Sequence, residues 1–475
     1  MLQLVPPPAG VTIRMYRSGG LGDCFLLAFA GPAATPCYVL IDCGVFYRTP
    51  GAEPRMQRIA ADIEAATGGR VDVLVATHEH WDHLSGFSFA QDVFKRLHVS
   101  EVWVAWTEDP QHPLARQLQQ RHQQALTALA AATQRLQAAN DPRAADLQQM
   151  LAFHGPFAAD AAASTREQLQ FVQTLGPVRY CRPGQPPLSL PTASGVKAYV
   201  LGPPEDETLL KRSNPRRGQV YEQPKPFGAA DTHGGAQPGS FYAAALAGPS
   251  AVDAPFNLPF VLPLAELADP TSQPAHAEFF RTRYGFTNAP GSAAWRRIDQ
   301  DWLGVAEHLA LDMDDDTNNT SLVLAFELPD GRVLLFPGDA QAGNWLSWAS
   351  VQWQAKEQVI TGQDLLRRVA VYKVGHHGSH NATLAAQGLE LMERDDLIAL
   401  LPVDEAQAKQ KNWKMPFGPL YERLQAKTGG RVVRADAGIP DRPIGVADSR
   451  WQQFLSQVRA DASAEQLWVE VDILA

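Results

Sequence analysis

Apolar and polar positions form short segments typical of β-strands along most of the chain. β-Branched and aromatic residues dominate these segments, and glycine, proline or aspartate separates them. Val71–Thr77 is apolar almost throughout, as expected for a strand that is covered on both faces. The patterns predict the strands Val11–Arg17, Cys24–Ala30, Cys37–Asp42, Val71–Thr77, Val102–Trp106, Ala198–Leu201, Ser321–Leu328, Arg332–Phe336, Val369–Val374, Leu397–Pro402 and Leu467–Leu474.

Helical spacing of apolar residues occurs between and beside these strands. It predicts helices over Arg55–Ala66 and Phe417–Ala426. Leu114–Gln137 and Arg143–Ala152, separated by Asp141-Pro142, predict a helical hairpin that packs on the domain, covers a site or binds a partner. Because strands occur in two blocks, each mixed with helices, we expect a two-layer sheet sandwich flanked by helices.

Two insertions divide the predicted sandwich. The first half covers residues 1–110, the helical insertion 111–175, the return to the sandwich 176–202, the second insertion 203–317, and the second half 318–475. The second insertion is dense in glycine and proline before Phe256 and of mixed character after it. We expect Gly228–Gly239 to be mobile and sensitive to proteolysis because it lacks apolar periodicity.

The amino-acid composition limits the class of protein to which the chain can belong. Of 475 residues, 45% are hydrophobic and 19% charged, which is typical of a globular protein. The net charge of −10 disfavours nonspecific attraction to nucleic acid, although a local basic surface could act against it. The four cysteines form no CxxC pair and are interpreted as buried free thiols. With no leader pattern and no membrane-length apolar run, we expect a cytoplasmic protein without membrane contact.

The strongest chemical signal is the segment Thr77–His83, in which His78, His80, Asp82 and His83 directly follow a predicted strand. Imidazole and carboxylate donors suit zinc or manganese. A strand end is stiff enough to hold ligands in place. A run of surface histidines is the alternative, but it would not normally follow an apolar strand.

Two distant segments supply further donors at predicted strand ends. Asp339 follows the strand Arg332–Phe336, and His376, His377 and His380 follow Val369–Val374. Alone, each is a turn or a surface pair more often than a ligand. Together with the first cluster they indicate one metal site.

The order of these features along the chain resembles that of the motifs in the metallo-β-lactamase superfamily. The features are Asp42, the HxHxDH segment, Asp339 and His376-His377. Within this superfamily, the chain is most similar to the ComEC-like hydrolase domains of DNA-uptake competence proteins. That similarity rests on Gly20-Leu21-Gly22-Asp23, Leu40-Ile41-Asp42-Cys43-Gly44, Asn318-Asn319-Thr320-Ser321-Leu322-Val323-Leu324, Phe336-Pro337-Gly338-Asp339 and Lys373-Val374-Gly375-His376-His377-Gly378-Ser379.

The resemblance implies a four-layer αββα sandwich, of class α/β (α+β), with two divalent ions, zinc or manganese, at one edge. His78 and His80 would hold the first ion. Asp82, His83 and either His376 or His377 would hold the second, and Asp339 would bridge the two. Asp42 and Asp23 would lie behind the ligands.

One departure concerns the first ion. Many superfamily members supply a third imidazole between HxHxDH and the bridging aspartate, where this chain has Asn318 and Asn319. ComEC-like members have asparagines there too. The first position is therefore expected to be oxygen-rich or poorly filled, which favours manganese.

The predicted chemistry is hydrolysis by a metal-bridging hydroxide at an anionic phosphodiester. Asp82 is placed among the catalytic residues, and the non-ligand of His376 and His377, or else His380, could protonate the leaving group. Lys373 and Ser379 could contact a phosphate, or could be a solvated strand residue and a turn residue.

Three functions remain open at this point. The first is a phosphodiesterase that acts on nucleic acid, with DNA favoured. The second is a small-molecule hydrolase that cleaves a phosphate ester, lactone or thioester, because the fold permits all of these. The third is an effector module activated by a protein partner that binds the helical insertion, residues 111–155.

Overall fold

The computed structural model describes residues 3–32, 35–138, 143–154, 164–193, 195–216, 218–221, 279, 283, 301–355 and 358–474. The chain divides into two compact units. Unit 1 comprises Met1–Gln119, Ala152–Phe227 and Asp314–Ala475, and unit 2 comprises Gln120–Leu151 and Gly228–Met313. Gly228–Gly239, expected to be mobile, lies outside the described residues.

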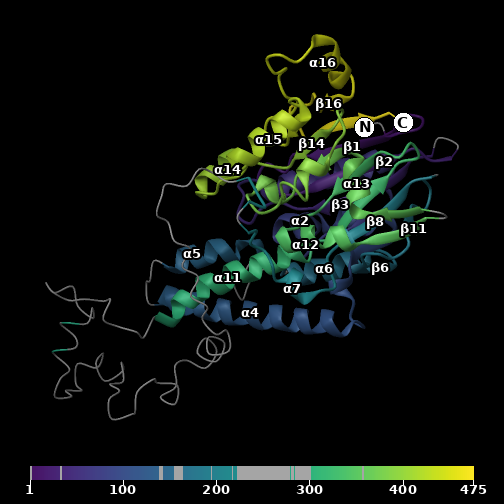
Figure 1. Cartoon of the computed structure of the whole chain (residues 1–475). Coiled ribbons are helices and arrows are strands. Elements are labelled where there is room, and N and C mark those ends of the chain that lie inside the picture. Colours follow the sequence, from purple (N-terminus) through teal and green to yellow (C-terminus); the bar gives the residue numbers. More distant parts are fainter. Residues whose placement is uncertain are drawn as a thin grey trace. The chain divides into compact units, whose positions relative to one another are not determined.

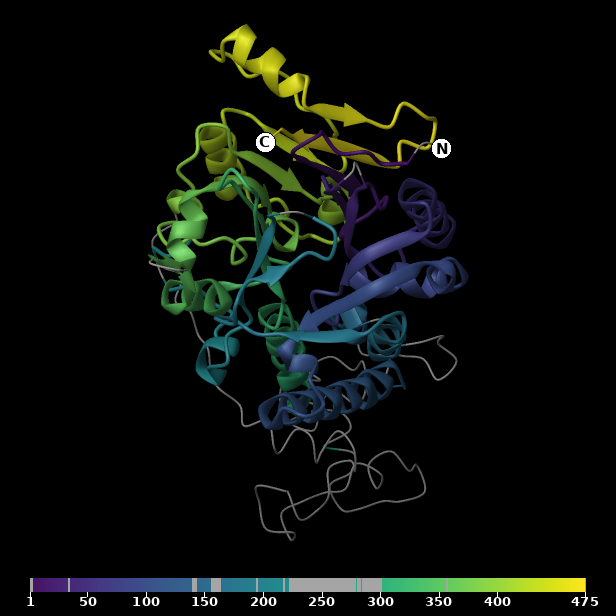
Figure 2. The same cartoon turned by 90° about the vertical axis from the view of Figure 1, so that its right-hand side faces the viewer.

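Unit 1 is built on two large sheets (Figures 1 and 2). Within the described residues, the first sheet has eight strands in the order β16-β17-β1-β2-β3-β4-β5-β6. These are β1 (Val11–Tyr16), β2 (Cys24–Phe29), β3 (Cys37–Cys43), β4 (Arg70–Val75), β5 (His98–Ala105), β6 (Val178–Cys181), β16 (Val458–Ala460) and β17 (Trp468–Ile473).

The second sheet has seven strands in the part of the chain that is described, in the order β15-β14-β13-β10-β9-β8-β7. They are β7 (Leu188–Ser189), β8 (Lys197–Gly202), β9 (Val323–Glu327), β10 (Val333–Phe336), β13 (Val369–Lys373), β14 (Ile398–Leu401) and β15 (Val432–Arg434). A separate hairpin pairs β11 (Gln352–Ala355) with β12 (Gln358–Thr361).

Successive side chains of each strand point to opposite faces of the sheet, and this alternation creates the layers. Val11, Ile13 and Met15 of β1 join one apolar core with Leu324 and Phe326 of β9, so this core lies between the sheets. The alternate residues face helices: Leu26 and Ala28 of β2 share a core with α1, and Val323 and Ala325 of β9 share one with α12. The predicted αββα order is therefore confirmed.

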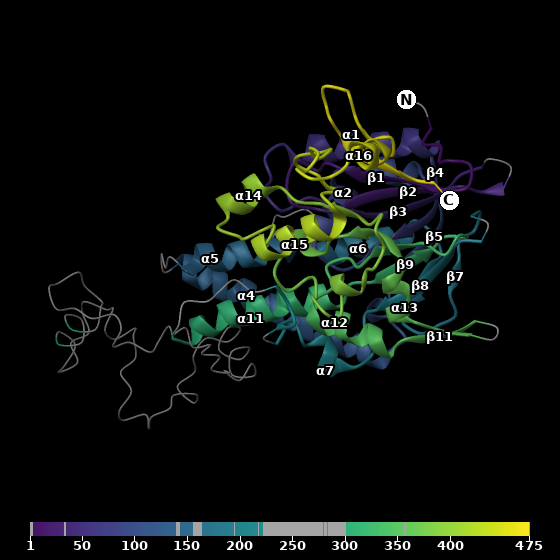
Figure 3. The same cartoon turned by 45° about the horizontal axis from the view of Figure 1, so that its top comes forward.

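Helices cover both outer faces, as Figure 3 shows for α1 and α2 beside β1–β4 and for α12 and α13 beside β8 and β9. Packed with the first sheet are α1 (Ala52–Thr67), α2 (Trp81–Phe89), α3 (Gln91–Arg96) and α6 (Thr165–Thr174). Packed with the second are α12 (Ala342–Ser347), α13 (Gly362–Arg367) and α15 (Gly418–Thr428). Further helices of unit 1 are α7 (Glu207–Leu210), α14 (Glu405–Gln410) and α16 (Asp448–Leu455).

Both helices of the predicted hairpin are present, as α4 (Pro113–Ala138) and α5 (Arg143–Met150). In unit 2, Leu129, Ala132 and Leu136 of α4 and Leu147 of α5 are buried. Several further helices were not predicted, among them α11 (Asp301–Asn319), which occupies the end of the second insertion and carries Asn318 and Asn319 in its last turn. Its acidic run Asp312–Asp316 lacks the apolar periodicity that marks a helix.

The sheet topology brings the predicted donors to one edge. β3 and β4 are parallel neighbours, so their carboxyl ends place Asp42 and the segment after Val75 side by side. β10 and β13 are also parallel neighbours, which places Asp339 beside His376 and His377. All four cysteines are free and buried, as predicted from the sequence.

Candidate metal centre

The loop that carries the histidines is anchored on two sides. After β4, the backbone N–H of Thr77 and its hydroxyl both donate to Asp42, at 2.8 and 2.7 Å. The carbonyl of Thr77 accepts from the N–H of Leu322 at 2.9 Å. His80 then precedes the first turn of α2, which holds Asp82 and His83. The donors therefore follow a backbone tied to both sheets.

Close packing explains two glycines near this loop. A Cβ on Gly44 would lie 2.3 Å from the carbonyl carbon of Asp82, so only glycine lets the two segments approach. Gly338, directly before Asp339, has a φ of +57°, and a Cβ there would lie 2.9 Å from Cβ of Ser321. Both glycines fix the position of an aspartate of the centre.

Asp82, His83, Asp339 and His377 form the inner part of the centre. Nε2 of His377 lies 3.0 Å from Oδ2 of Asp82, and Nε2 of His83 lies 3.2 Å from Oδ2 of Asp339. Their side chains are at most 1% exposed. Within the described residues, neither Oδ1 of Asp82 nor Nε2 of His83 makes a hydrogen bond. Buried polar atoms normally have a partner, so these atoms fit metal ligands.

Two acceptors orient the imidazoles. Nδ1 of His83 lies 2.8 Å from Oδ2 of Asp42, and Nδ1 of His377 donates to the carbonyl of Pro402 at 2.6 Å. In both rings Nε2 is thereby left facing the carboxylates, as in metal sites where an outer acceptor fixes the histidine. The geometry thus favours His377 over His376, which the sequence left open.

The charge balance at the centre is carried by Lys373, which is 1% exposed. Its ammonium donates to Asp339 at 3.0 Å and to the carbonyl of Gly338 at 2.8 Å, and it pairs with Asp23. Burial acts to raise the pKa of Asp339, but Lys373 and His83 outweigh it and hold that pKa well below its usual value. Asp339 is therefore ionised and able to bind a cation.

These contacts correct one expectation for Lys373. All three of its donor positions are occupied by Asp23, Asp339 and Gly338, so it is neither a solvated strand residue nor a group free to contact a phosphate. Asp23 lies behind the ligands as expected, joined to the centre through Lys373.

His83 is surrounded by carboxylates. Besides Asp42 and Asp339, Oδ2 of Asp82 lies 3.8 Å and Oδ2 of Asp23 lies 3.9 Å from its ring. Burial acts to lower the pKa of His83, but these negative charges outweigh it and raise the pKa well above its usual value. The position attracts positive charge, which a divalent cation supplies more fully than a proton.

His78 and His376 lie next to this group. Nε2 of His78 is 3.1 Å from Nδ1 of His80, and His78 lies close enough to His83 and Asp339 to share an ion with them. The backbone N–H of His376 donates to Asp339 at 2.9 Å, while its ring Nδ1 lies 3.1 Å from the hydroxyl of Ser379. Burial lowers the pKa of His376 to about 4, so its ring is neutral at pH 7.

Strained backbone accompanies the donors. Asp42, His376 and His377 have φ angles of 54°, 43° and 51°, in the left-handed region that residues other than glycine rarely adopt. Such conformations cluster at functional sites, where the surrounding structure holds them.

Three other predicted residues are placed differently. His380 is exposed beside the ring of Phe417, and no donor group among the described residues includes it. Ser379 donates to Asn381 at 2.9 Å, as a turn residue does. The side-chain oxygen of Asn319 accepts from the backbone N–H groups of Gln341 and Asn344, so it holds the α12 segment.

Sequence reasoning missed two donors near His80. His154 ends a short 3-10 helix, Leu151–His154, and Asp314 lies in α11. One ligand atom from each of His80, His154 and Asp314 lies within 4.8 Å of the others. His154 is an isolated histidine in the alanine-rich insertion, and Asp314 is one of several acidic residues before Asn318, so neither had a distinguishing signal.

Glu79, inside the motif, was also missed, and it faces away from the donors. Its carboxylate accepts from Arg166 of α6 at 3.2 Å, and Arg166 also donates to Glu108 at 2.7 Å. This partly buried ion pair fastens the histidine loop to α6.

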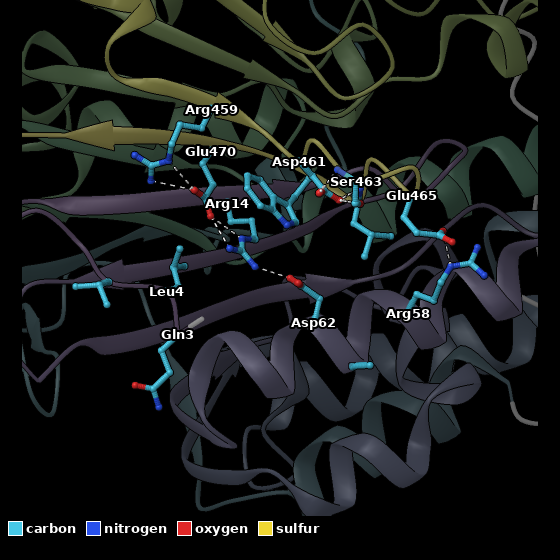
Figure 4. Close-up of a pocket in the computed structure, with 14 residues that line it drawn as sticks. Gln3, Leu4, Arg14, Arg58, Asp62, Arg459, Asp461, Ser463, Glu465 and Glu470 are labelled. Atoms are coloured by element: carbon cyan, nitrogen blue, oxygen red, sulfur yellow. Dashed lines mark hydrogen bonds and ion pairs between the residues drawn. The ribbon is translucent and has the colours of Figure 1, made fainter. Parts of the chain in front are cut away.

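A hollow of about 1140 Å³ lies elsewhere in unit 1 and is lined by charged residues (Figure 4). Most of its charges are paired, including Arg14 with Asp62 and Glu470, and Arg58 with Glu465 at 2.8 Å. Arg14 thereby ties β1 to α1 and β17. The ion pairs around this hollow hold the strands together, and none of the donors described above lines it.

The fold and these donors together define an αββα sandwich with clusters of histidine and aspartate, compatible with metal binding, at the carboxyl ends of its strands. Residues 20–145 of the chain match the family model described as Metallo-beta-lactamase superfamily. This segment contains Asp23, Asp42 and the whole HxHxDH motif, and the fold is the sandwich of that superfamily. No curated protein and no solved structure matches the chain.

Of the helices in the described ranges, none combines the length and the apolar run that a bilayer crossing requires.

Proposed function

We propose that this protein is a metal-dependent hydrolase with a dinuclear centre. One observation carries the proposal: Asp339 belongs to two donor groups at once, with His78 and His83 in one and with Asp82 and His377 in the other. A carboxylate shared by two groups is suited to bridging two cations. Two adjacent ions activate a water molecule near neutral pH and neutralise negative charge that develops on the substrate.

The residues of the chain contribute in defined ways. Asp42 and the carbonyl of Pro402 fix the rings of His83 and His377, so little reorganisation accompanies metal binding. Lys373 keeps Asp339 ionised. His376 presents a neutral ring beside the centre, and an anionic substrate would raise its pKa and let it hold the proton for a leaving group.

The substrate class we propose is a phosphodiester, with DNA favoured and manganese as the favoured activator. Hydrolysis of a phosphodiester passes through an anionic transition state that a pair of cations stabilises. The choice of DNA is supported by the similarity to ComEC-like motifs. With a net charge of −10, DNA binding must depend on a local basic surface, so cleavage should fall steeply with added salt.

A second candidate is a small-molecule hydrolase, and aromatic packing favours it. Phe153 stacks on Trp413 with ring centroids 5.3 Å apart, and its ring lies 5.6 Å from that of His80 and 6.3 Å from that of His376. Phe46 packs against both Phe153 and Trp413. An apolar wall beside the donors suits the acyl or aryl part of a small ester.

The test compares single- and double-stranded DNA with bis-p-nitrophenyl phosphate and small esters, in manganese and in zinc. Asp82→Asn should abolish turnover of every substrate, whereas Asp92→Asn, on the exposed side of α3, should not. Cleavage of DNA supports the first proposal. Turnover of a small substrate without DNA cleavage would transfer the function to the second candidate.

Inertness towards all of these substrates, with metal demonstrably bound, would contradict both candidates. It would favour an effector whose hydrolysis depends on a protein partner that binds the helical insertion.

A further inference from the structure

A separate set of donors faces the second nitrogen of His80. Nδ1 of His80 points to His78, as described above, while its Nε2 lies 3.5 Å from Oδ1 of Asp314. His154 completes the set, with its ring centroid 4.9 Å from that of His80. His80 and His154 are 1% and 2% exposed, and the side chain of Asp314 is 15% exposed. The three donors come from segments distant in the sequence.

Neighbouring contacts hold these donors in place. Phe153, directly before His154, is fixed by its stacking on Trp413, and the carbonyl of His154 accepts from Thr165 at 3.5 Å. On α11, the side-chain amide of Asn318 donates to Oδ2 of Asp314 at 3.3 Å. That bond leaves the other carboxylate oxygen of Asp314 directed at His80.

Two of the facing atoms lack hydrogen bonds. In the described part of the chain, neither Nε2 of His80 nor Oδ1 of Asp314 has a hydrogen-bond partner, although both are buried. A cation among these groups would satisfy both atoms.

We propose that His80, His154 and Asp314 bind one divalent cation, in a position separate from the two donor groups that share Asp339. The inference rests on the proposed function, because His80 belongs to the HxHxDH motif. Two imidazoles and one carboxylate suit zinc or manganese. This position takes its second imidazole from residue 154 and its carboxylate from α11.

The test uses the full chain, stripped of metal with a chelator and then dialysed against zinc. Metal content is measured for the wild type, His154→Gln and Asp314→Asn, and X-ray absorption counts the imidazoles on zinc. Each variant should bind one equivalent fewer than the wild type, or bind it at least about 100-fold more weakly, since changes behind the ligands alone cost 10–100-fold. The average imidazole count should fall in His154→Gln.

Two exposed residues provide matched controls. Asp92→Asn changes an exposed carboxylate of α3, and His98→Gln changes an exposed histidine of β5, so both should bind metal as the wild type does. Circular dichroism confirms that each variant is folded, and Asp314→Asn keeps the size of the side chain if His154→Gln misfolds.

Wild-type stoichiometry and an unchanged imidazole count in both variants would overturn the inference and leave the proposed function standing. A wild type that binds no metal at all would overturn both.

Discussion

Nδ1 of His83 lies 2.8 Å from Oδ2 of Asp42, a residue 41 positions earlier in the chain. Asp42 also accepts from the backbone N–H and the hydroxyl of Thr77. One carboxylate therefore fixes both the ring of His83 and the start of the loop that carries the other donors. This arrangement makes Asp42 important for metal binding although its own oxygens are occupied.

Replacing Asp42 with asparagine should weaken metal binding without unfolding the protein. Asparagine tolerates the left-handed backbone at this position, where φ is 54°, but it lacks the charge that holds the imidazole. We expect a loss of about 10–100-fold in zinc affinity, typical of groups that orient a ligand. Competition with a chelating dye measures it, with Asp330→Asn in the β9–β10 turn as the control; equal affinities for the two variants would contradict the role of Asp42.

Asp339→Asn should abolish activity and lower metal content, because the shared carboxylate is lost. Asp330→Ala should do neither. The contacts of Asp339 with Lys373 and with the N–H of His376 show that Asp339→Ala does more than remove a ligand. Breaking this buried ion pair should cost about 3 kcal/mol of the free energy of unfolding. Urea titrations of the three variants compare these effects, and an Asp339→Asn protein with full metal content would refute the bridging role.

Metal addition should stabilise the folded protein. A ligand that binds only the folded state adds about 2.7 kcal/mol at a concentration 100 times its Kd. The melting temperature should therefore rise when zinc or manganese is added to chelator-treated protein, and fall again with excess chelator. Asp82→Asn should reduce this shift, while Asp92→Asn should keep it. A shift of the same size in both variants would show that the metal acts elsewhere.

Glu390, which lies away from the centre, should make a pH-dependent contribution to the free energy of unfolding. Its hydrogen bond from Arg423, at 2.7 Å, is the main cause that lowers the pKa of Glu390 from 4.5 to about 2. A lowered pKa stabilises the folded state above pH 4.5, and this stabilisation is lost as the pH falls towards 2. Since the side chain is 32% exposed, solvent screening limits the effect to about 1 kcal/mol.

The measurement is urea unfolding of wild type and Glu390→Gln between pH 7 and pH 3. The two should differ at pH 7 and converge as the pH falls below 4.5. Glu393→Gln, whose carboxylate is 62% exposed, should match the wild type throughout. A difference for Glu390→Gln that does not change with pH would show that the charge of Glu390 is not responsible.

Local patterns were sufficient to predict the layers of the sandwich. The alternation of Val11, Ile13 and Met15, and the apolar run that ends at Thr77, are consequences of strands with one or two covered faces, and β1 and β4 confirm them. The same patterns did not predict α11, because its acidic residues interrupt the helical spacing of apolar positions.

Patterns along the chain were sufficient to predict that the donors follow strands, namely His78, His80, Asp82, His83, Asp339 and the His376–His377 pair. In the structure, parallel pairing of β3 with β4 and of β10 with β13 brings them to one edge. The directions in which the side chains point depend on contacts that form only in the folded protein. Pro402 orients His377, Lys373 turns inward to Asp23 and Asp339, and His154 and Asp314 reach His80. The spacing of residues along the chain indicates where each one lies on its strand or helix. The orientation of its side chain depends on packing and hydrogen bonds with residues far away in the sequence.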